Sequence, residues 1–125
     1  MAVDQDDVPD LSMKIVETTI LTKQIEKLIG DDEKQNLLDE LIIAPDAGDL
    51  IRGSGGLRKL RWSAPGRGKR GGIRVIYYWN QGQVMYLLVA YPKNKKDDLS
   101  ADELRVLSAV VQEEKATWRR SSSET

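Results

Sequence analysis

A chain of 125 residues is long enough for one domain with a hydrophobic core and too short for two. It has no cysteine, which excludes disulfides, thiolate nucleophiles and cysteine-based zinc sites, and no histidine, which removes the commonest general base and metal ligand. The hydrophobic fraction of 40% is ordinary and the charged fraction of 31% is high, which indicates a soluble globular protein. Because histidine and cysteine are absent, any catalysis must use Lys, Arg, Tyr or carboxylate side chains.

The N-terminal segment, residues 1–12, is acidic and has few apolar groups, which predicts a disordered tail and not a signal peptide. The longest apolar stretch, residues 84–91, is far shorter than the roughly 20 residues that cross a bilayer. The sequence therefore predicts a cytoplasmic protein without a membrane segment.

Two helices are predicted after a first strand over residues 13–18. The first helix begins at about Thr19 and ends at Gly30, and the second, over 31–44, opens with acidic residues and stops before Pro45. They form a helical hairpin with two apolar stripes, which are Leu21, Ile25, Leu28 and Ile29, and Leu37, Leu38, Leu41 and Ile42.

Three more strands are predicted after a glycine-rich, irregular segment over 45–56. The first strand covers 57–62, and a loop over 63–72, rich in glycine, leads to the second, 73–79. The turn "NQGQ" joins this strand to the third, 84–91.

The chain ends in a predicted helix. Ser100 suits the N-cap position and Glu103 lies three residues on, a capping-box pattern. The helix runs to about Trp118, residues 119–125 form a frayed C-terminus, and the inward side chains are Leu104, Leu107, Val110 and Val111. The prediction is an α+β domain over residues 13–118, of order β-α-α-β-β-β-α, with a small, mainly antiparallel sheet flanked by helices.

Positive charge is concentrated in the middle of the chain. Between Leu50 and Lys96, eleven residues are Lys or Arg and none is Asp or Glu. The other eight basic residues and all 20 acidic residues lie outside this span, so the middle carries +11 and the ends together −12. This separation indicates a face that binds a polyanion, most often a nucleic acid, and the alternative is a solvated basic surface without a partner.

Several of these cations are expected to converge. Lys59 and Arg61 project from the same face of their strand because side chains at i and i+2 share a face. If the next strand pairs with it as a hairpin, Arg74 joins them, and Lys93 can reach the same rim. The alternative is the ordinary solvent face of a sheet, although such a face normally mixes Thr, Ser, Glu and Lys.

RNA cleavage by attack of a 2′-OH needs a proton acceptor, stabilisation of the charge on the phosphorane and a proton for the leaving 5′-oxygen. Clustered cations supply the second of these, and arginine offers a planar fork to two phosphate oxygens. A lysine crowded by other cations is a conceivable base, and Tyr91 or Tyr77 could act as an acid or stack on a nucleobase.

Two other motifs are discounted. "GRGKRGG" lacks the spacing of a phosphate-binding P-loop, and no helix pattern follows it directly. The acidic residues Asp97, Asp98, Asp102 and Glu103 open a predicted helix, where acids are favoured, so capping is preferred to a metal site and no metal is predicted.

Three strings of the sequence, "GDLIRGSGGLRKLRW", "GRGKRGGIRVIYYW" and "YLLVAYPKNKKDDLS", resemble the RelE/ParE superfamily of bacterial toxins, and most of all its HigB-type branch. The strings cover roughly residues 48–100, and the flanking helices fit in position. The resemblance implies the toxin of a type II toxin–antitoxin module.

In the RelE and HigB branches, the toxin enters the ribosomal A site and cuts mRNA without a metal or cofactor, and a protein antitoxin neutralises it. The resemblance therefore implies ribosome, mRNA and a cognate antitoxin, expected to be a helix-turn-helix DNA-binding protein, as partners. The family's catalytic basic residues fall on Lys59, Arg61 and Arg74, and Tyr91 and Lys93 complete the predicted catalytic set. Predicted RNA or ribosome contacts are Arg58, Arg67, Lys69, Arg70, Lys95 and Lys96.

The sequence also departs from the family pattern. Where the RelE-like enzymes have a further arginine after the last strand, this chain has Asn94 beside Lys93, and Leu99 stands where they have a catalytic tyrosine. The general acid and base therefore remain unassigned. Two alternatives stay open: a ParE-like inhibitor of DNA gyrase, and an RNA- or ribosome-binding module that is not an enzyme.

Overall fold

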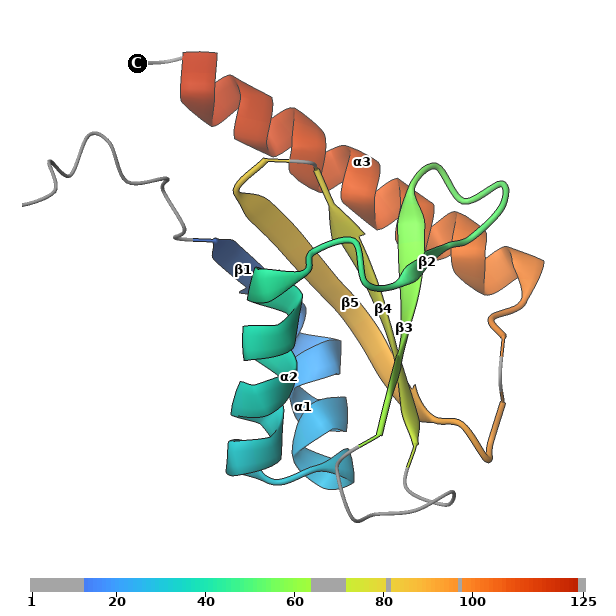
Figure 1. Ribbon diagram of the computed structural model, residues 1–125. Helices are drawn as coiled ribbons and strands as arrows, with labels where there is room; N and C mark the ends of the chain where they lie inside the picture. Colours follow the sequence, from blue (N-terminus) through green and yellow to red (C-terminus); the bar gives the residue numbers. More distant parts are fainter. Residues whose placement is uncertain (1–12, 64–71, 81, 97, 124–125) are drawn as a thin grey trace, which may run out of the picture.

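The computed structural model describes residues 13–63, 72–80, 82–96 and 98–123. The predictions for the acidic tail, residues 1–12, and for most of the basic loop, residues 64–71, lie outside these described residues. The described part has three layers, with a helical hairpin on one face of a sheet and a long C-terminal helix across the other (Figure 1).

The sheet has five strands in the order β1-β5-β4-β3-β2. β3 (Leu57–Trp62), β4 (Ile73–Trp79) and β5 (Val84–Pro92) form the predicted antiparallel meander. β1 (Lys14–Glu17) pairs with β5 in parallel, so the sheet is mixed, and β2 (Asp49–Leu50) forms an antiparallel edge beside β3. The predicted α+β fold is confirmed, and β2 adds a strand within a segment that we expected to be irregular.

The three helices begin close to their predicted positions, and the predicted side-chain cap is found at the C-terminal helix. α1 (Thr19–Leu28) is capped by Thr18, whose Oγ1 accepts the Leu21 N–H at 2.9 Å, and α2 (Asp31–Ile43) follows after Gly30. Before α3 (Ala101–Ser123), Ser100 and Glu103 form the predicted capping box, with reciprocal bonds of 2.8 and 3.1 Å. α3 continues to Ser123, past the end that we predicted near Trp118.

Two hydrophobic clusters hold the layers together. The hairpin covers one face of the sheet through Leu21, Ile25, Ile29, Leu37 and Leu41, which pack on Leu60, Trp62, Ile73, Val75, Tyr77, Met85, Leu87 and Ala90. α3 covers the other face through Val111, with Leu104, Leu107 and Val110, on Leu57, Ile76, Val84, Tyr86, Leu88 and Tyr91. Ile42, which we placed in the buried stripe of α2, is instead 37% exposed.

A β-bulge sets the register of the meander. β4 and β5 pair without interruption from Ile73 to Ile76, and the register then shifts between Ile76 and Tyr77. Leu88 and Val89 consequently both lie on the α3 side. On either side of this pair, the side chains of β5 alternate regularly between the two faces of the sheet. The apolar run of β5 contains no alternation from which this register could be predicted.

Tyr77 fixes the loop that leads into β2. Its ring is fully buried, its hydroxyl donates to the Pro45 carbonyl at 2.8 Å, and it accepts the Gly48 N–H at 2.8 Å. A Cβ at Gly48 would lie 2.7 Å from the Tyr77 ring, so only glycine fits there. This close approach places Asp49, the next residue, at the start of the edge strand.

Candidate functional site

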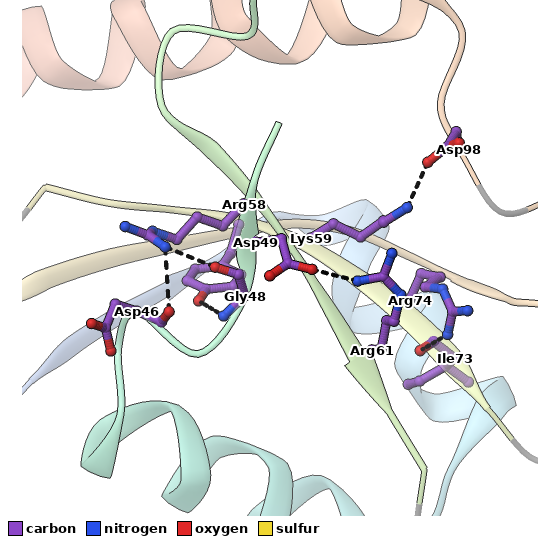
Figure 2. A network of polar contacts seen from close by, with 10 residues as sticks. Asp46, Gly48, Asp49, Arg58, Lys59, Arg61, Ile73, Arg74 and Asp98 are labelled. Atoms are coloured by element: carbon purple, nitrogen blue, oxygen red, sulfur yellow. Dashed lines mark hydrogen bonds and ion pairs between the residues drawn. The ribbon is translucent and has the colours of Figure 1, made fainter. Parts of the chain in front are cut away.

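Three side chains form a row across neighbouring strands on the α3 side of the sheet. Arg61 on β3 lies directly opposite Arg74 on β4, and Arg74 lies opposite Tyr91 on β5. Residues directly opposite each other in an antiparallel pair share a face, with Cα atoms about 4.5–5.5 Å apart. We call Arg61, Arg74 and Tyr91 the cation row, and Figure 2 shows the two arginines beside each other.

Lys59 lies one pair further along the same face, where it is opposite Ile76. Its side chain is only 10% exposed, and its Nζ donates to Oδ1 of Asp98 at 2.5 Å (Figure 2). Asp98 itself lies in the segment between β5 and α3, and its side chain is 79% exposed. The predicted cluster of Lys59, Arg61 and Arg74 therefore comes together on one face, and a carboxylate is in contact with its most buried member.

Arg61 also has a carboxylate partner. Its Nη1 donates to Oδ2 of Asp49 at 2.5 Å, from the edge strand β2, and both side chains are at least half exposed. Sequence reasoning did not identify Asp49 or Asp98 as parts of the site. A signal was present, because Asp49 directly precedes the basic span that contains no acid, and Asp98 lies just after it.

Arg74 and Tyr91 are held against the sheet. Arg74 is half-buried and its Nη1 donates to the Ile73 carbonyl at 3.4 Å, at the limit of a hydrogen bond. Tyr91 is 7% exposed, and the Lys96 ammonium lies over its ring at 5.5 Å from the centroid. Tyr91 therefore lies beside Arg74 in the sheet, and the Lys96 ammonium covers one face of its ring.

The remaining predicted site residues are distributed around this row. Lys93 directly follows β5, its N–H donates to the Gly72 carbonyl at 3.1 Å, and its aliphatic stem packs over Gly72, where a Cβ would be 3.0 Å from it. Lys95 is exposed, and Lys96 also forms an ion pair with Glu103 at 2.5 Å. Arg67, Lys69 and Arg70 lie outside the described residues, so the structure does not place them.

Arg58 faces the other side of the sheet from Lys59. Its Nη1 donates to the carbonyls of Gly48 at 2.7 Å and Asp46 at 3.3 Å (Figure 2), and the Gly48 N–H donates to the Tyr77 hydroxyl. Arg58 therefore stabilises the loop before β2, and its predicted contact with RNA stays a prediction.

Tyr77, the second tyrosine considered as an acid, points away from the cation row. Its hydroxyl is on the α2 side of the sheet, and burial raises its pKa above the usual 10.0. Its two hydrogen bonds are both to backbone groups of the loop. Of the two tyrosines, Tyr91 is thus the one on the face that carries the cations.

The described residues of this face have the chemistry of an anion site. Two guanidinium groups side by side can bind several phosphate oxygens, and the Lys59 ammonium comes from two residues away on the same face of β3. Among the residues that the structure describes, no group of three or more Asp or Glu side chains is arranged to hold a metal ion. Within that same part of the chain, no helix is long and apolar enough to cross a membrane.

Comparisons with known proteins identify the fold and the family of this chain. The structure is similar to that of the E. coli toxin RelE, determined as a mutant in the free state, with a TM-score of 0.51 and 14% sequence identity. The match covers 69% of this chain and 88% of RelE, and at this identity it shows the shared fold. The family model described as the RelE toxin of the RelE/RelB toxin–antitoxin system matches residues 13–121, and the chain therefore belongs to the RelE toxin family.

Proposed function

We propose that this toxin is a metal- and cofactor-independent endoribonuclease that cuts mRNA in the A site of the translating ribosome and so inhibits translation. Membership of the RelE toxin family supports a toxin of a toxin–antitoxin module. The observation that carries the nuclease proposal is the pairing of Arg61 with Arg74 on one sheet face, with Lys59 next to them.

In the proposed reaction, the 2′-oxygen of one nucleotide attacks the adjacent phosphorus and loses its proton. The bond from phosphorus to the 5′-oxygen breaks, the 5′-oxygen takes up a proton, and the products are a 2′,3′-cyclic phosphate and a 5′-hydroxyl. Arg61 and Arg74 donate to the non-bridging oxygens, whose negative charge grows in the transition state. A missing donor of this kind costs about 10²–10³ in kcat.

The proton transfers are assigned to groups on the same face. Tyr91, opposite Arg74, is the proposed proton donor to the 5′-oxygen. Lys59 is the proposed acceptor for the 2′-OH proton, a role that it can take only as the neutral amine, after its ion pair with Asp98 has opened. Lys93 follows β5, and we propose that it contacts a neighbouring phosphate at the rim of the site. Leu99 stands where the family pattern has a tyrosine, which is why we assign the donor role to Tyr91.

The ribosome is the proposed means of presenting the substrate. The basic span carries eleven cations and no acid, so it is suited to phosphate groups of ribosomal RNA as well as mRNA. Arg58, Arg67, Lys69, Arg70, Lys95 and Lys96 are the proposed contacts. A cognate antitoxin, which we expect to be a helix-turn-helix protein, and a cytoplasmic location complete the proposal.

The test is inducible expression of the wild type and of Arg74→Ala, with primer extension on a defined translated mRNA. We expect cuts in phase with codons and 5′-hydroxyl ends from the wild type, and at least a hundredfold fewer cuts from the variant. Lys23→Ala, an exposed lysine on α1, is the matched control and should cut like the wild type.

Two results would contradict the proposal. If growth inhibition persists unchanged in Arg74→Ala, the cation row has no catalytic role. If the mRNA stays intact while DNA damage accumulates, the toxin acts on gyrase as ParE-like proteins do.

A further inference from the structure

A cavity of about 390 Å³ opens where the cation row ends. Its walls come from the start of α1, from β5, from the segment between β5 and α3, and from the first turns of α3. They include Ile20, Gln24, Val89, Tyr91, Lys96 and Val106. Ile20 and Val106 are 61% and 63% exposed, so two large aliphatic side chains face solvent at this cavity. The function proposed above uses only Tyr91 and Lys96 of these residues.

The cavity is within reach of a nucleotide bound at the cation row. Tyr91 belongs to both, because it is opposite Arg74 in the sheet and also lines the cavity. Neighbouring strands are about 4.8 Å apart, so the step from Arg74 to Tyr91 is shorter than one nucleotide. A phosphate held by Arg61 and Arg74 therefore brings the base of an adjoining nucleotide to the cavity.

The size and chemistry of the cavity suit a single planar ring system. Its volume falls in the range of about 300–1,000 Å³ that is usual for small-molecule pockets, with mostly apolar walls and a few polar groups. Gln24 is fixed because its Oε1 accepts the Ala90 N–H at 2.8 Å, and Asp102 and Glu103 add acceptors at the rim. A protein partner would need about 800 Å² of surface on this side, far more than these two exposed side chains provide.

We propose that this cavity binds the nucleobase of a nucleotide that adjoins the scissile phosphate. The inference rests on the proposed function, because it assigns a base-binding subsite to the same active face. Ile20, Val89 and Val106 form the apolar walls that cover the base, and the base replaces the Lys96 ammonium over the Tyr91 ring. Base stacking of this kind is sequence-tolerant, so the cavity selects an unpaired base more strongly than a particular one.

The first test is a titration of the full chain with AMP, GMP, CMP and UMP, observed through the methyl NMR signals of Ile20, Val89 and Val106. We expect saturable shifts in the wild type and about tenfold weaker binding in Val106→Trp and Ile20→Trp, which fill the cavity from α3 and from α1. Both positions are largely exposed, so the variants should fold. Ile43→Trp on α2, at a site 83% exposed, is the matched control and should bind like the wild type.

Ribose 5-phosphate, which has the sugar and phosphate of a nucleotide but no base, is the control that distinguishes base binding from phosphate binding. If it shifts the same methyl signals as the nucleotides do, or if no nucleotide shifts them, the cavity is not a base site. The inference is also wrong if Val106→Trp binds nucleotides normally but is no longer neutralised by the cognate antitoxin. The cavity would then be a site where a protein docks.

The second test maps cut sites on translated mRNA for Val106→Trp and Ile43→Trp. We expect Val106→Trp to cut about tenfold more slowly and Ile43→Trp to match the wild type. If the wild type cuts no mRNA, the proposed function fails and the nucleotide titration still decides the cavity. If the wild type cuts mRNA and the titration fails, only the cavity proposal is lost.

Discussion

The pair of Lys59 and Asp98 predicts an asymmetry between two single substitutions. Asp98→Asn removes the carboxylate from an ammonium whose side chain is 10% exposed, whereas Lys59→Met leaves behind a carboxylate that is 79% exposed. Breaking a fully buried pair from one side costs about 3–5 kcal/mol, and an exposed pair is worth about 0–1 kcal/mol. Because this pair is buried at one end only, we expect Asp98→Asn to lower the free energy of unfolding by about 1–3 kcal/mol.

Lys59→Met should behave differently. Methionine keeps most of the aliphatic volume beside the buried Ile76, and the exposed Asp98 regains water, so the free energy of unfolding should stay within about 1 kcal/mol of the wild type. The same variant should cut translated mRNA at least a hundredfold more slowly, because it lacks the amine that is the proposed proton acceptor. A residue that costs activity and little stability is expected at a functional site.

Urea denaturation of the two single variants and the double variant, at one pH and salt concentration, measures both effects and their coupling. Lys23→Met is the matched control, since Lys23 is exposed on α1, and neither its stability nor its activity should change. Equal losses of stability in Asp98→Asn and Lys59→Met would refute the reasoning, and so would normal cleavage by Lys59→Met.

Three further outcomes are expected from groups outside the cation row. Tyr77→Phe leaves the buried Gly48 N–H without its acceptor and should cost about 1–3 kcal/mol in urea denaturation; a loss below 0.5 kcal/mol would contradict this. The raised pKa of Tyr77 means that its contribution to stability is complete below about pH 10 and is lost as pH rises further, so stability should fall above pH 10, less steeply in Tyr77→Phe. Ser100→Ala removes the N-cap of α3 and should cost about 1 kcal/mol in thermal denaturation, and Ser100→Asp, which can still cap, is the control that should retain stability.

The elements of the fold could be predicted because their signals are local. The capping pattern of Ser100 and Glu103 and the helical spacing of Leu21 and Ile25 each follow from residues close in sequence. The edge strand β2 could not be predicted, since it has only two residues and forms because the Tyr77 hydroxyl binds the backbone next to it. The parallel pairing of β1 with β5 likewise depends on residues far apart in the chain.

The cations of the candidate site could be predicted from the sequence, and its carboxylates could not. Lys59 and Arg61 share a face by strand geometry alone, and the hairpin brings Arg74 to the same face. Asp49 and Asp98 reach these cations from an edge strand and from a connecting segment, and neither position follows from a local periodicity. The uniformly apolar sequence of β5 contains no signal for the β-bulge in the pairing that places Tyr91 opposite Arg74.

The parallel pairing of β1 has a consequence for the order in which the toxin is made and folded. Thr18, directly after β1, donates through its hydroxyl to the Leu88 carbonyl, 70 residues later in the chain. During synthesis β1 therefore cannot pair until β5 has been made, and contacts between residues this far apart in the sequence are slow to form. Tyr91 completes the cation row at the end of that same strand, and Asp98 reaches Lys59 only afterwards. A partly synthesised chain thus lacks the complete candidate face, which is assembled only after β5 and the segment that contains Asp98 have emerged from the ribosome.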